Sequence, residues 1–298
     1  MSKLTVPTVL TTIERMADKL DKAGLSFADG YGQGTTNAFD EACWLVLWQL
    51  GFAIDNLDEV QNRPITVEQL ADITVLVEKR IRTRQPAAYL TREAWLLGVA
   101  FYVDERVIIP RSLIAELLFD ESIDPWLGEH TTRVLDLCTG NGSLAVLAAM
   151  VYPDVTVDAA DISLEALAVA RINVDKHGLA GRITLIASDG LAACTGPYDL
   201  IICNPPYVNA VSMAALPAEF RAEPSLALAG GSDGMDFVRQ LFETVSDYMS
   251  ENAVLVLEIG HEKRYFNQAF PELEPLWLDT SAGNAQVLLL TREQLTLR

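Results

Sequence analysis

The run from Tyr198 to Ile202 is apolar except for Asp199, and Cys203-Asn204-Pro205-Pro206-Tyr207 follows it directly. Proline cannot donate to a sheet ladder, so an apolar run that stops at two prolines predicts a buried strand ending at the edge of a sheet. Open α/β sheets bind their ligands at the carboxyl ends of their strands, which is where Asn204 would lie. The stretch therefore predicts an α/β fold with a functional site beside Asn204.

The motif after this strand suits a planar amino group. The amide oxygen of Asn204 accepts hydrogen bonds, and the two prolines stiffen the backbone so that the Pro205 carbonyl forms a second fixed acceptor. Tyr207 adds a flat face beside them. Asn204, Pro205, Pro206 and Tyr207 are thus candidate substrate-binding residues, and all but Pro206 are candidate catalytic residues. An Asn-Pro turn followed by a core tyrosine explains the same letters, and only the sequence upstream separates the two interpretations.

A glycine-containing turn lies upstream, between a strand predicted at Arg133 to Leu137 and a helix predicted at Leu144 to Met150. Glycines at such a turn permit positive φ and let the backbone approach a ligand closely. Asp136 would repel a pyrophosphate but attract the sulfonium or amino group of S-adenosylmethionine, so the sign of its charge favours a methyl donor over a dinucleotide. The candidate cofactor-binding residues here are Asp136, Cys138, Thr139, Gly140, Asn141 and Gly142.

Two further predicted strands end in acids. The strand Val155 to Ala160 ends at Asp161, about 20 residues beyond the glycine turn, where a carboxylate can hold ribose hydroxyls. The strand Arg182 to Ala187 leads into Ser188-Asp189-Gly190, which suits an adenine amino group. Each acid alone is more often a helix cap or turn residue. Three acids at successive strand ends, with the Asn204 motif at the fourth, predict a single cofactor pocket, so Asp161, Asp189, Gly190 and Asn204 are candidate cofactor-binding residues as well.

The first 88 residues predict a small helical domain. Apolar residues recur at helical spacing from Val6 to Leu20, the run from Phe39 to Phe52 is apolar nearly all round, and Thr66 can cap a third helix that ends near Arg84. From Tyr89 to Pro110, aromatic and β-branched residues interrupted by Gly98 predict a β-hairpin that links the two domains.

Residues 111–298 predict the cofactor-binding domain. Ser112 is expected to cap its first helix, Ser163 is expected to cap another that reaches about His177, and Arg111 either faces the cleft or is a solvated surface charge. Downstream of the motif we expect a substrate loop or lid at Val211 to Leu228, a flexible turn at Gly230 to Gly234, a helix at Met235 to Met249, a strand at Ala253 to Ile259, and a closing hairpin of Leu273 to Leu278 with Ala285 to Thr291.

Composition limits the partners. A chain of 298 residues with 50% hydrophobic and 21% charged residues is ordinary globular material, and its length favours two domains. Its 22 basic and 41 acidic residues give a net charge of −19, which repels a polyanion and attracts a basic protein, although solubility alone would also explain it.

Cysteine and histidine usage indicates neither disulfides nor a metal. Four cysteines without C-x-x-C spacing are interpreted as reduced, mostly buried thiols, which favours a cytoplasmic location, and three separated histidines predict no zinc site. The start at Met1 lacks an apolar signal core, and no window is long enough to span a membrane. Gly30-Tyr31-Gly32-Gln33-Gly34 follows no strand, so we interpret it as a loop and not a nucleotide-binding fingerprint.

The set Asp136-x-x-x-Gly140-x-Gly142, Asp161, Asp189 and Asn204-Pro205-Pro206-Tyr207 resembles class I S-adenosylmethionine-dependent methyltransferases that modify NH₂ groups. With the helical leader, the linking hairpin and Ile109-Pro110-Arg111, essentially the whole chain resembles the protein-glutamine methyltransferases. The resemblance implies a Rossmann-like, seven-stranded mixed sheet, a substrate-recognition role for residues 1–88, S-adenosylmethionine as cofactor and S-adenosylhomocysteine as product.

Two branches of this family differ in substrate. One methylates the GGQ glutamine of release factors, and the other a glutamine of large-subunit ribosomal protein L-three. Residues 85–95 and 101–107 are similar to the ribosomal-protein branch, and Ser112 to Glu116 replaces the Pro-Asp-Thr-Glu that usually follows Pro110-Arg111 in the release-factor branch. Cys138 stands where the family often has glycine and Gly190 where the release-factor branch commonly has an aromatic residue, so contacts to adenosine are expected to differ.

The resemblance also implies a mechanism. Asn204 and the Pro205 carbonyl accept the hydrogens of the glutamine amide, localise its lone pair and align it with the donor methyl, because Asn204 cannot act as a base at neutral pH. A nucleic-acid adenine methyltransferase shares the motif but would be expected to carry a basic groove. A non-catalytic ribosome-assembly factor that keeps the fold is the remaining alternative.

Overall fold

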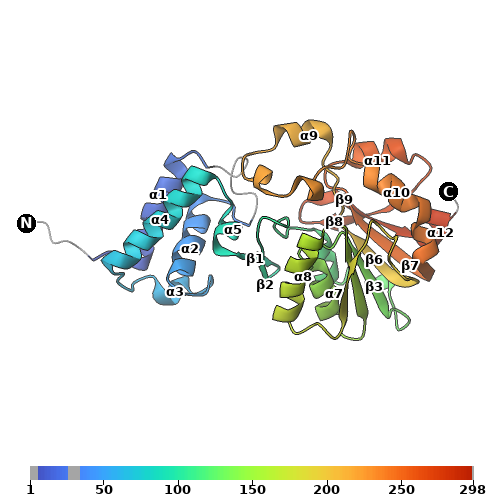
Figure 1. Cartoon of the computed structure of the whole chain (residues 1–298), viewed down its shortest axis with the longest axis horizontal. Helices are drawn as coiled ribbons and strands as arrows, with labels where there is room; N and C mark the ends of the chain where they lie inside the picture. The colour runs from blue at the N-terminus through green and yellow to red at the C-terminus, as the bar shows by residue number, and fades with distance from the viewer. Residues whose placement is uncertain (1–5, 26–33, 297–298) are drawn as a thin grey trace, which may run out of the picture. The chain divides into compact units, whose positions relative to one another are not determined.

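The computed structural model describes residues 6–25 and 34–296 (Figure 1). The chain start at residues 1–5 and the glycine-rich stretch at 30–33 lie outside the described residues. Two compact units are formed, one by residues 1–93 together with 217–222 and the other by residues 94–216 together with 223–298. The first unit therefore consists of two separate segments of the chain. The boundary after Glu93 falls inside the segment that was expected to be a linking hairpin.

The first unit is helical. Its helices are α1 (Val9–Lys22), α2 (Ala38–Gln49), α3 (Leu57–Val60), α4 (Val67–Thr83) and α5 (Ala87–Thr91). Three of them match the helices predicted from apolar spacing and caps. Thr8 and Thr66 each form a reciprocal capping box, and Asn37 caps α2 by accepting from the Asp40 N–H. The apolar faces of α1, α2 and α4 supply most of this unit's buried residues.

A buried arginine binds residues 217–222, the second segment of the chain that belongs to this unit. Arg80 on α4 is 0% exposed and donates to Glu41 Oε1 at 2.8 Å and to Glu219 Oε1 at 3.1 Å. The Arg84 Nε lies 2.6 Å from the same Glu219 oxygen. Burial raises the pKa of Glu41, although the charge of Arg80 opposes that shift. Residues 217–222 are therefore fixed by charge as well as by packing.

The linking segment is more helical and less extended than its residue types predicted. Tyr89 lies in α5, which begins after Pro86, and only β1 (Glu93–Leu96) and β2 (Val99–Tyr102) form a hairpin. Residues 107–109 are not in a strand, because Asp104 turns the chain by accepting from the Arg106 N–H and side chain. The Arg106 guanidinium lowers the pKa of Asp104 to about 2.

The second unit is built on a seven-stranded sheet. Its strands are β3 (Arg133–Leu137), β4 (Thr156–Asp161), β5 (Ile183–Ala187), β6 (Tyr198–Cys203), β7 (Met249–Glu258), β8 (Leu276–Thr280) and β9 (Gly283–Thr291). The order is β5-β4-β3-β6-β7-β9-β8, parallel as far as β7, with β9 antiparallel to both β7 and β8. The predicted mixed sheet and closing hairpin are confirmed.

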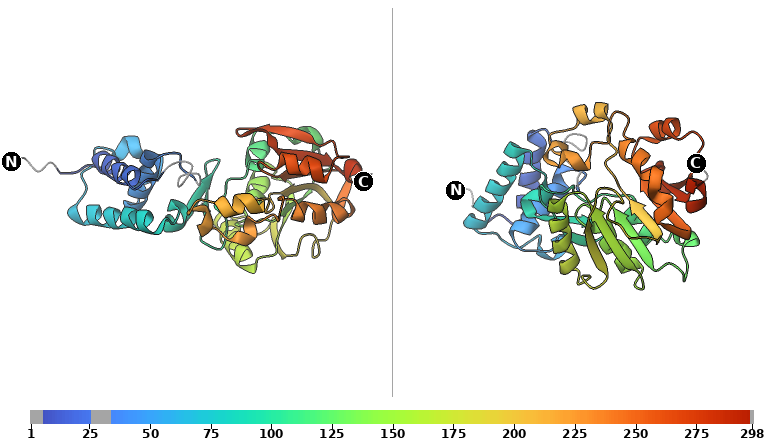
Figure 2. Two further views of the ribbon diagram at one scale, coloured as in Figure 1. Left: turned by 90° about the horizontal axis from the view of Figure 1, so that it is seen from above. Right: turned by 45° about the vertical axis from the view of Figure 1, so that its right-hand side comes forward.

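Helices cover both faces of this sheet (Figures 1 and 2). One face packs against α6 (Ile114–Phe119), α7 (Ser143–Val151) and α8 (Leu164–Lys176), and the other against α10 (Asp236–Thr244), α11 (Lys263–Ala269) and α12 (Arg292–Thr296). Alternate residues of one strand serve the two cores: Val134 faces the first and Leu135 the second. The short elements of this unit are α9 (Ala210–Ala215), η2 (Asp124–Trp126), η4 (Ser225–Ala227) and η5 (Val245–Tyr248), and η3 (Phe220–Ala222) belongs to the first unit.

Two helix predictions need correction. Ser112 precedes Leu113, the N-cap of α6: its hydroxyl oxygen accepts from the Ile114 N–H at 3.3 Å, at the start of the helix, while its hydrogen is donated to Glu258 Oε2 at 2.6 Å. The helix expected from Met235 to Met249 ends as α10 at Thr244 and continues as the tighter η5. Ser163 does cap α8, as predicted, by accepting from the Ala166 N–H. Within the described ranges, no helix is both long and apolar enough to cross a bilayer.

Candidate active site

The ends of four parallel strands bring the candidate residues to one edge of the sheet. Leu137 at the end of β3 pairs with Cys203 at the end of β6 on one side and with Ala160 of β4 on the other. The chain runs outward in opposite directions from β3 and β6, so the two strands flank a switch in strand order, where such folds bind ligands. The glycine turn after β3 and the Asn204 motif after β6 face each other across this switch.

The turn after β3 depends on left-handed backbone. Cys138, Gly140 and Gly142 have φ values of 63°, 55° and 80°, and Cys138 is the only one of the three that carries a side chain. A Cβ on Gly142 would lie 3.1 Å from the Cβ of Ala170 on α8, so glycine also allows close helix packing. Cys138 and Gly140 line a cavity, whereas Thr139, Asn141 and Gly142 do not.

Asp136 is buried beneath this turn and does not line the cavity. Its Oδ2 accepts from the Thr139 hydroxyl at 2.5 Å and from the Ala145 N–H at 2.9 Å. Burial is the main cause that raises its pKa to about 7, and the charge of Asp161 adds to the shift. Among the described residues, neither its Oδ1 nor the buried Nδ2 of Asn141 has a hydrogen-bond partner.

Asp161 joins two parts of the cavity wall. Its Oδ2 accepts from the Gly140 N–H and its Oδ1 from the Ser163 N–H, each at 2.8 Å. Burial raises its pKa, and these backbone donors act in the opposite direction. Ser188, Asp189 and Gly190, after β5, line the cavity as well. The acids predicted at the ends of β4 and β5 thus lie at the cavity.

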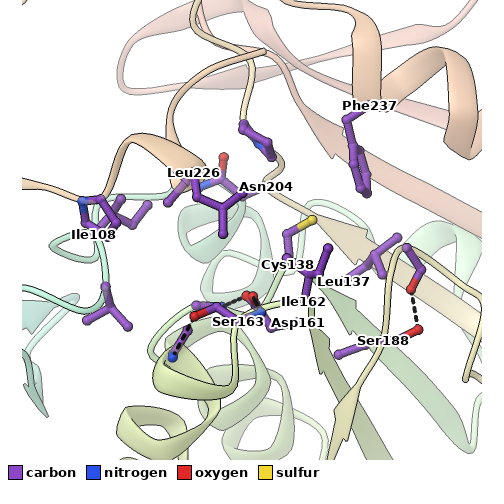
Figure 3. A pocket seen from close by; sticks show the side chains of 18 of the residues that line it. Ile108, Leu137, Cys138, Asp161, Ile162, Ser163, Ser188, Asn204, Leu226 and Phe237 are labelled. Atoms are coloured by element: carbon purple, nitrogen blue, oxygen red, sulfur yellow. Dashed lines mark hydrogen bonds between the residues drawn. The ribbon is translucent and has the colours of Figure 1, made fainter. Parts of the chain in front are cut away.

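The cavity itself has an empty volume of about 890 Å³, counting the space open to solvent. Figure 3 shows the side chains of Asn204, Cys138 and Asp161 gathered around it. Ile108, Leu226 and Phe237 give it an apolar wall. A size of several hundred cubic ångströms, apolar walls and a few polar groups are typical of a small-molecule site. Leu226 falls within the predicted substrate loop, but the wall as a whole was not predicted, because its three residues come from a loop, from η4 and from α10 and share no periodic signal.

The Asn204 motif contributes two residues to the lining of the cavity. Asn204 and Pro206 line it, whereas Pro205 and Tyr207 are not among its lining residues. Within the described part of the chain, the Asn204 side chain makes no hydrogen bond, so its amide is available to a substrate. The Tyr207 hydroxyl donates to Glu258 Oε1 at 3.0 Å.

Three glycines pack closely around Tyr207. A Cβ on Gly230 would lie 2.7 Å from the Tyr207 Cα, one on Gly234 would lie 2.3 Å from its carbonyl oxygen, and one on Gly260 would lie 2.5 Å from its ring. Val208 also pairs with Ala229, through bonds to Leu228 and Gly230. The turn at Gly230 to Gly234, expected to be flexible, is therefore a packed support for the motif.

Arg111 forms a bidentate ion pair and is not a solvated charge. It donates to Glu223 Oε1 at 2.6 Å and to Glu223 Oε2 at 2.7 Å, and Glu223 Oε1 also accepts from the Ile109 N–H. Ile108 and Pro224, each next to a member of this cluster, line the cavity. Glu223 was not predicted from the sequence, and Ile109-Pro110-Arg111 was the only signal pointing to this cluster.

The four cysteines are free thiols. Cys194 and Cys203 are buried, but Cys43 and Cys138 are half-buried, so burial is less general than predicted. Across residues 6–25 and 34–296, no group of three or more His, Cys, Asp or Glu side chains is arranged to hold a metal ion.

Comparison with known proteins points to methyl transfer. Residues 116–256 match the family model described as Methyltransferase small domain. A Bordetella pertussis protein named ribosomal protein uL3 glutamine methyltransferase is 51% identical, covering 89% of each chain, and a Burkholderia pseudomallei protein of that name is 46% identical, covering 97% of this chain and 95% of its own. The crystallised hMettl16 catalytic domain, in complex with a MAT2A 3'UTR hairpin, has a TM-score of 0.51 at 12% identity over 76% of this chain and 81% of its own, which is a likeness of fold.

Proposed function

The chain belongs to the ribosomal protein uL3 glutamine methyltransferase family, and on that premise we propose that it transfers a methyl group from S-adenosylmethionine to the side-chain amide nitrogen of a glutamine in ribosomal protein uL3. The observation that carries the proposal is the position of Asn204. It follows β6, lines the cavity and lies across the strand-order switch from the glycine turn.

The residues around the cavity fit S-adenosylmethionine. Asp161 and Asp189 offer carboxylate acceptors for hydroxyl and amino groups, and Cys138 with Gly140 brings the turn up to the cavity. Beneath the turn, the unpartnered Asp136 Oδ1 would favour a nearby cationic group. When bound, S-adenosylmethionine supplies a methyl group on a positively charged sulfur.

Asn204 is proposed to bind and orient the substrate amide. A carboxamide nitrogen is a poor nucleophile because its lone pair is delocalised into the carbonyl. The Asn204 oxygen and the Pro205 carbonyl accept its two hydrogens, which holds the group in one orientation and favours a localised lone pair. Positioning of this kind can contribute roughly 7–11 kcal/mol to lowering a barrier. Geometry therefore substitutes for a general base in the transfer, and the nitrogen that gains the methyl group would lose one of its two protons to solvent afterwards.

Pro206 and Tyr207 are proposed to complete the substrate site. Pro206 lines the cavity beside Asn204. The Tyr207 ring is held by Gly260 and by the hydrogen bond to Glu258, which supports a fixed surface against which the planar amide packs. The apolar wall of Ile108, Leu226 and Phe237 excludes water, which strengthens every polar interaction in the site.

A basic protein partner is proposed on charge. A net charge of −19 attracts a basic ribosomal protein and repels free nucleic acid. We therefore expect no direct nucleic-acid binding, and we place the reaction in the cytoplasm, where ribosomal proteins are synthesised. The relatives named for uL3 favour this substrate over release factors.

The test is labelled methyl transfer from S-adenosylmethionine to purified uL3, to release factors and to DNA, followed by peptide mapping. We expect label on a glutamine of uL3. Label on release factor alone would assign the protein to the other branch, and label on DNA would indicate an adenine methyltransferase. Binding of S-adenosylmethionine without methyl transfer to any of the three would support the alternative of a non-catalytic ribosome-assembly factor.

A further inference from the structure

Glu258 is a buried carboxylate beside the motif that the proposed reaction does not use. It is 4% exposed and is the last residue of β7. Its neighbour Leu257 is the register partner of Cys203. Glu258 follows Leu257 and Asn204 follows Cys203. Both residues therefore lie at the same edge of the sheet, at the ends of the adjacent strands β7 and β6.

Three donors converge on this carboxylate. Oε1 accepts from the Tyr207 hydroxyl at 3.0 Å, and Oε2 accepts from the Ser112 hydroxyl at 2.6 Å and from the Leu113 N–H at 2.9 Å. One side chain thus ties the aromatic residue of the motif to the segment that begins at Ile109. That segment is also held by Glu223, through Arg111.

Packing restricts the Tyr207 ring in addition to this hydrogen bond. Gly260, two residues after Glu258, leaves room for the ring edge that a Cβ would fill. A tyrosine turns about two torsions: the hydrogen bond at its hydroxyl, which lies on the axis of the second torsion, fixes the first, and the close approach of Gly260 to the ring edge restricts the second. A buried carboxylate is costly to desolvate, so it is better explained by a positioning role than by stability.

We propose that Glu258 is a positioning residue for the methyl transfer, acting through Tyr207: its carboxylate fixes the tyrosine ring beside Asn204 and anchors that ring to residues 112 and 113. The inference rests on the proposed function. Glu258 touches neither the cavity nor the proposed substrate position, so it orients the site without taking part in the chemistry.

Single-turnover methylation of uL3 by Glu258→Ala, Glu258→Gln and Tyr207→Phe tests this role. We expect Glu258→Ala to lower the rate by about 10-fold to 10²-fold, with the S-adenosylmethionine concentration that gives half the maximal rate within about threefold of wild type. Glu258→Gln should recover most of the rate, because its oxygen can accept from Ser112 and Leu113 while its NH₂ donates to Tyr207. In a Tyr207→Phe background, Glu258→Ala should cost less than it does alone.

Asp199 offers a matched control at the opposite end of β6. It accepts four hydrogen bonds, from the N–H and the hydroxyl of Thr132, from the Arg133 N–H and from the Ser250 hydroxyl. Asp199→Ala should lower stability without changing the rate constant at saturating substrates. An equal loss of rate in Asp199→Ala and Glu258→Ala would show a general packing effect and overturn the inference.

Fluorine NMR of 3-fluorotyrosine-labelled protein adds a readout independent of activity. The Tyr207 resonance, assigned with Tyr207→Phe, should shift and broaden in Glu258→Ala. An unchanged resonance, or a wild-type rate in folded Glu258→Ala, would overturn this inference and leave the proposed function standing. A wild-type enzyme that transfers nothing to uL3 would reject the proposed function and this inference with it. If Glu258→Ala does not fold, Glu258→Gln and Tyr207→Phe carry the test.

Discussion

Single residues of the site divide into those that meet the cavity and those that hold others in place. Asp161 and Asn204 line the cavity, whereas Asp136 and Thr139 bond to each other beneath it. The sequence predicted all four as site residues, because each lies at a strand end or in the turn. Spacing alone could not separate them, since the direction of a side chain in a turn depends on backbone angles such as the positive φ of Cys138.

Asp136 should make stability depend on pH. Its folded pKa of about 7 lies above the ordinary 3.8, so the folded state binds its proton more tightly than the unfolded state. The resulting stabilisation is fully present below about pH 3.8 and is lost as the pH rises towards 7. Relative to Asp136→Asn, the wild-type free energy of unfolding should fall between pH 4 and 7, by at most a few kcal/mol at about 1.4 kcal/mol per pKa unit.

Urea unfolding of the two proteins at several pH values measures this difference. Asp55→Asn, at an exposed aspartate of the helical unit, is the control. A difference between wild type and Asp136→Asn that stays constant with pH would contradict the account of Asp136.

At the scale of elements, most strands could be predicted from the sequence, whereas the structure of the segments that connect them and the contacts those segments make could not. β3 was predicted with its observed bounds, because a short apolar run between polar turns specifies a buried strand. Residues 107–109 looked like a strand for the same reason. Their side chains instead fill the core and the cavity wall, and Val107 and Ile109 are each 1% exposed.

The partners of Arg111 and Ser112 could not be predicted from local sequence. Glu223 lies 112 residues beyond Arg111, and Glu258 lies 146 residues beyond Ser112. No spacing rule connects residues so far apart. Only the folded chain brings each pair together, since Glu258 alone of the four lies in a strand.

The packed turn after η4 gives a test of element packing. Gly230→Ala should displace the motif, because its new Cβ would meet the Tyr207 Cα at 2.7 Å and the Pro206 carbonyl oxygen at 2.8 Å. We expect methyl transfer to fall by about 10²-fold, as a shift of roughly 1 Å can cause. Gly181→Ala is the matched control, since a Cβ there meets nothing within 4 Å. Equal turnover in the two variants would show that this close approach does not position the motif.

At the scale of the whole molecule, charge and chain path were only partly predictable. A helical part and a sheet-containing part were expected from the change in residue pattern, and both are observed. The return of residues 217–222 to the helical unit was not expected, because its cause is the buried Arg80 and its distant partner Glu219. A buried arginine cannot be told from an exposed one by its spacing.

The net charge of −19 should govern encounter with the substrate protein. Electrostatically steered association slows as salt screens the charges, so raising ionic strength from about 0.05 M to about 0.3 M should lower the association rate constant with uL3 by about tenfold. Stopped-flow binding measures this rate. The dissociation rate is expected to change less, and an association rate independent of salt would contradict a steering role for the charge.

The most direct measurement compares single-turnover methylation of uL3 by wild type and Asn204→Ala, with S-adenosylmethionine binding measured on both by calorimetry. If Asn204 holds the glutamine amide, the variant should bind the cofactor about as well as wild type and transfer its methyl group at least about 10²-fold more slowly. Equal transfer rates in a folded Asn204→Ala protein would contradict that claim.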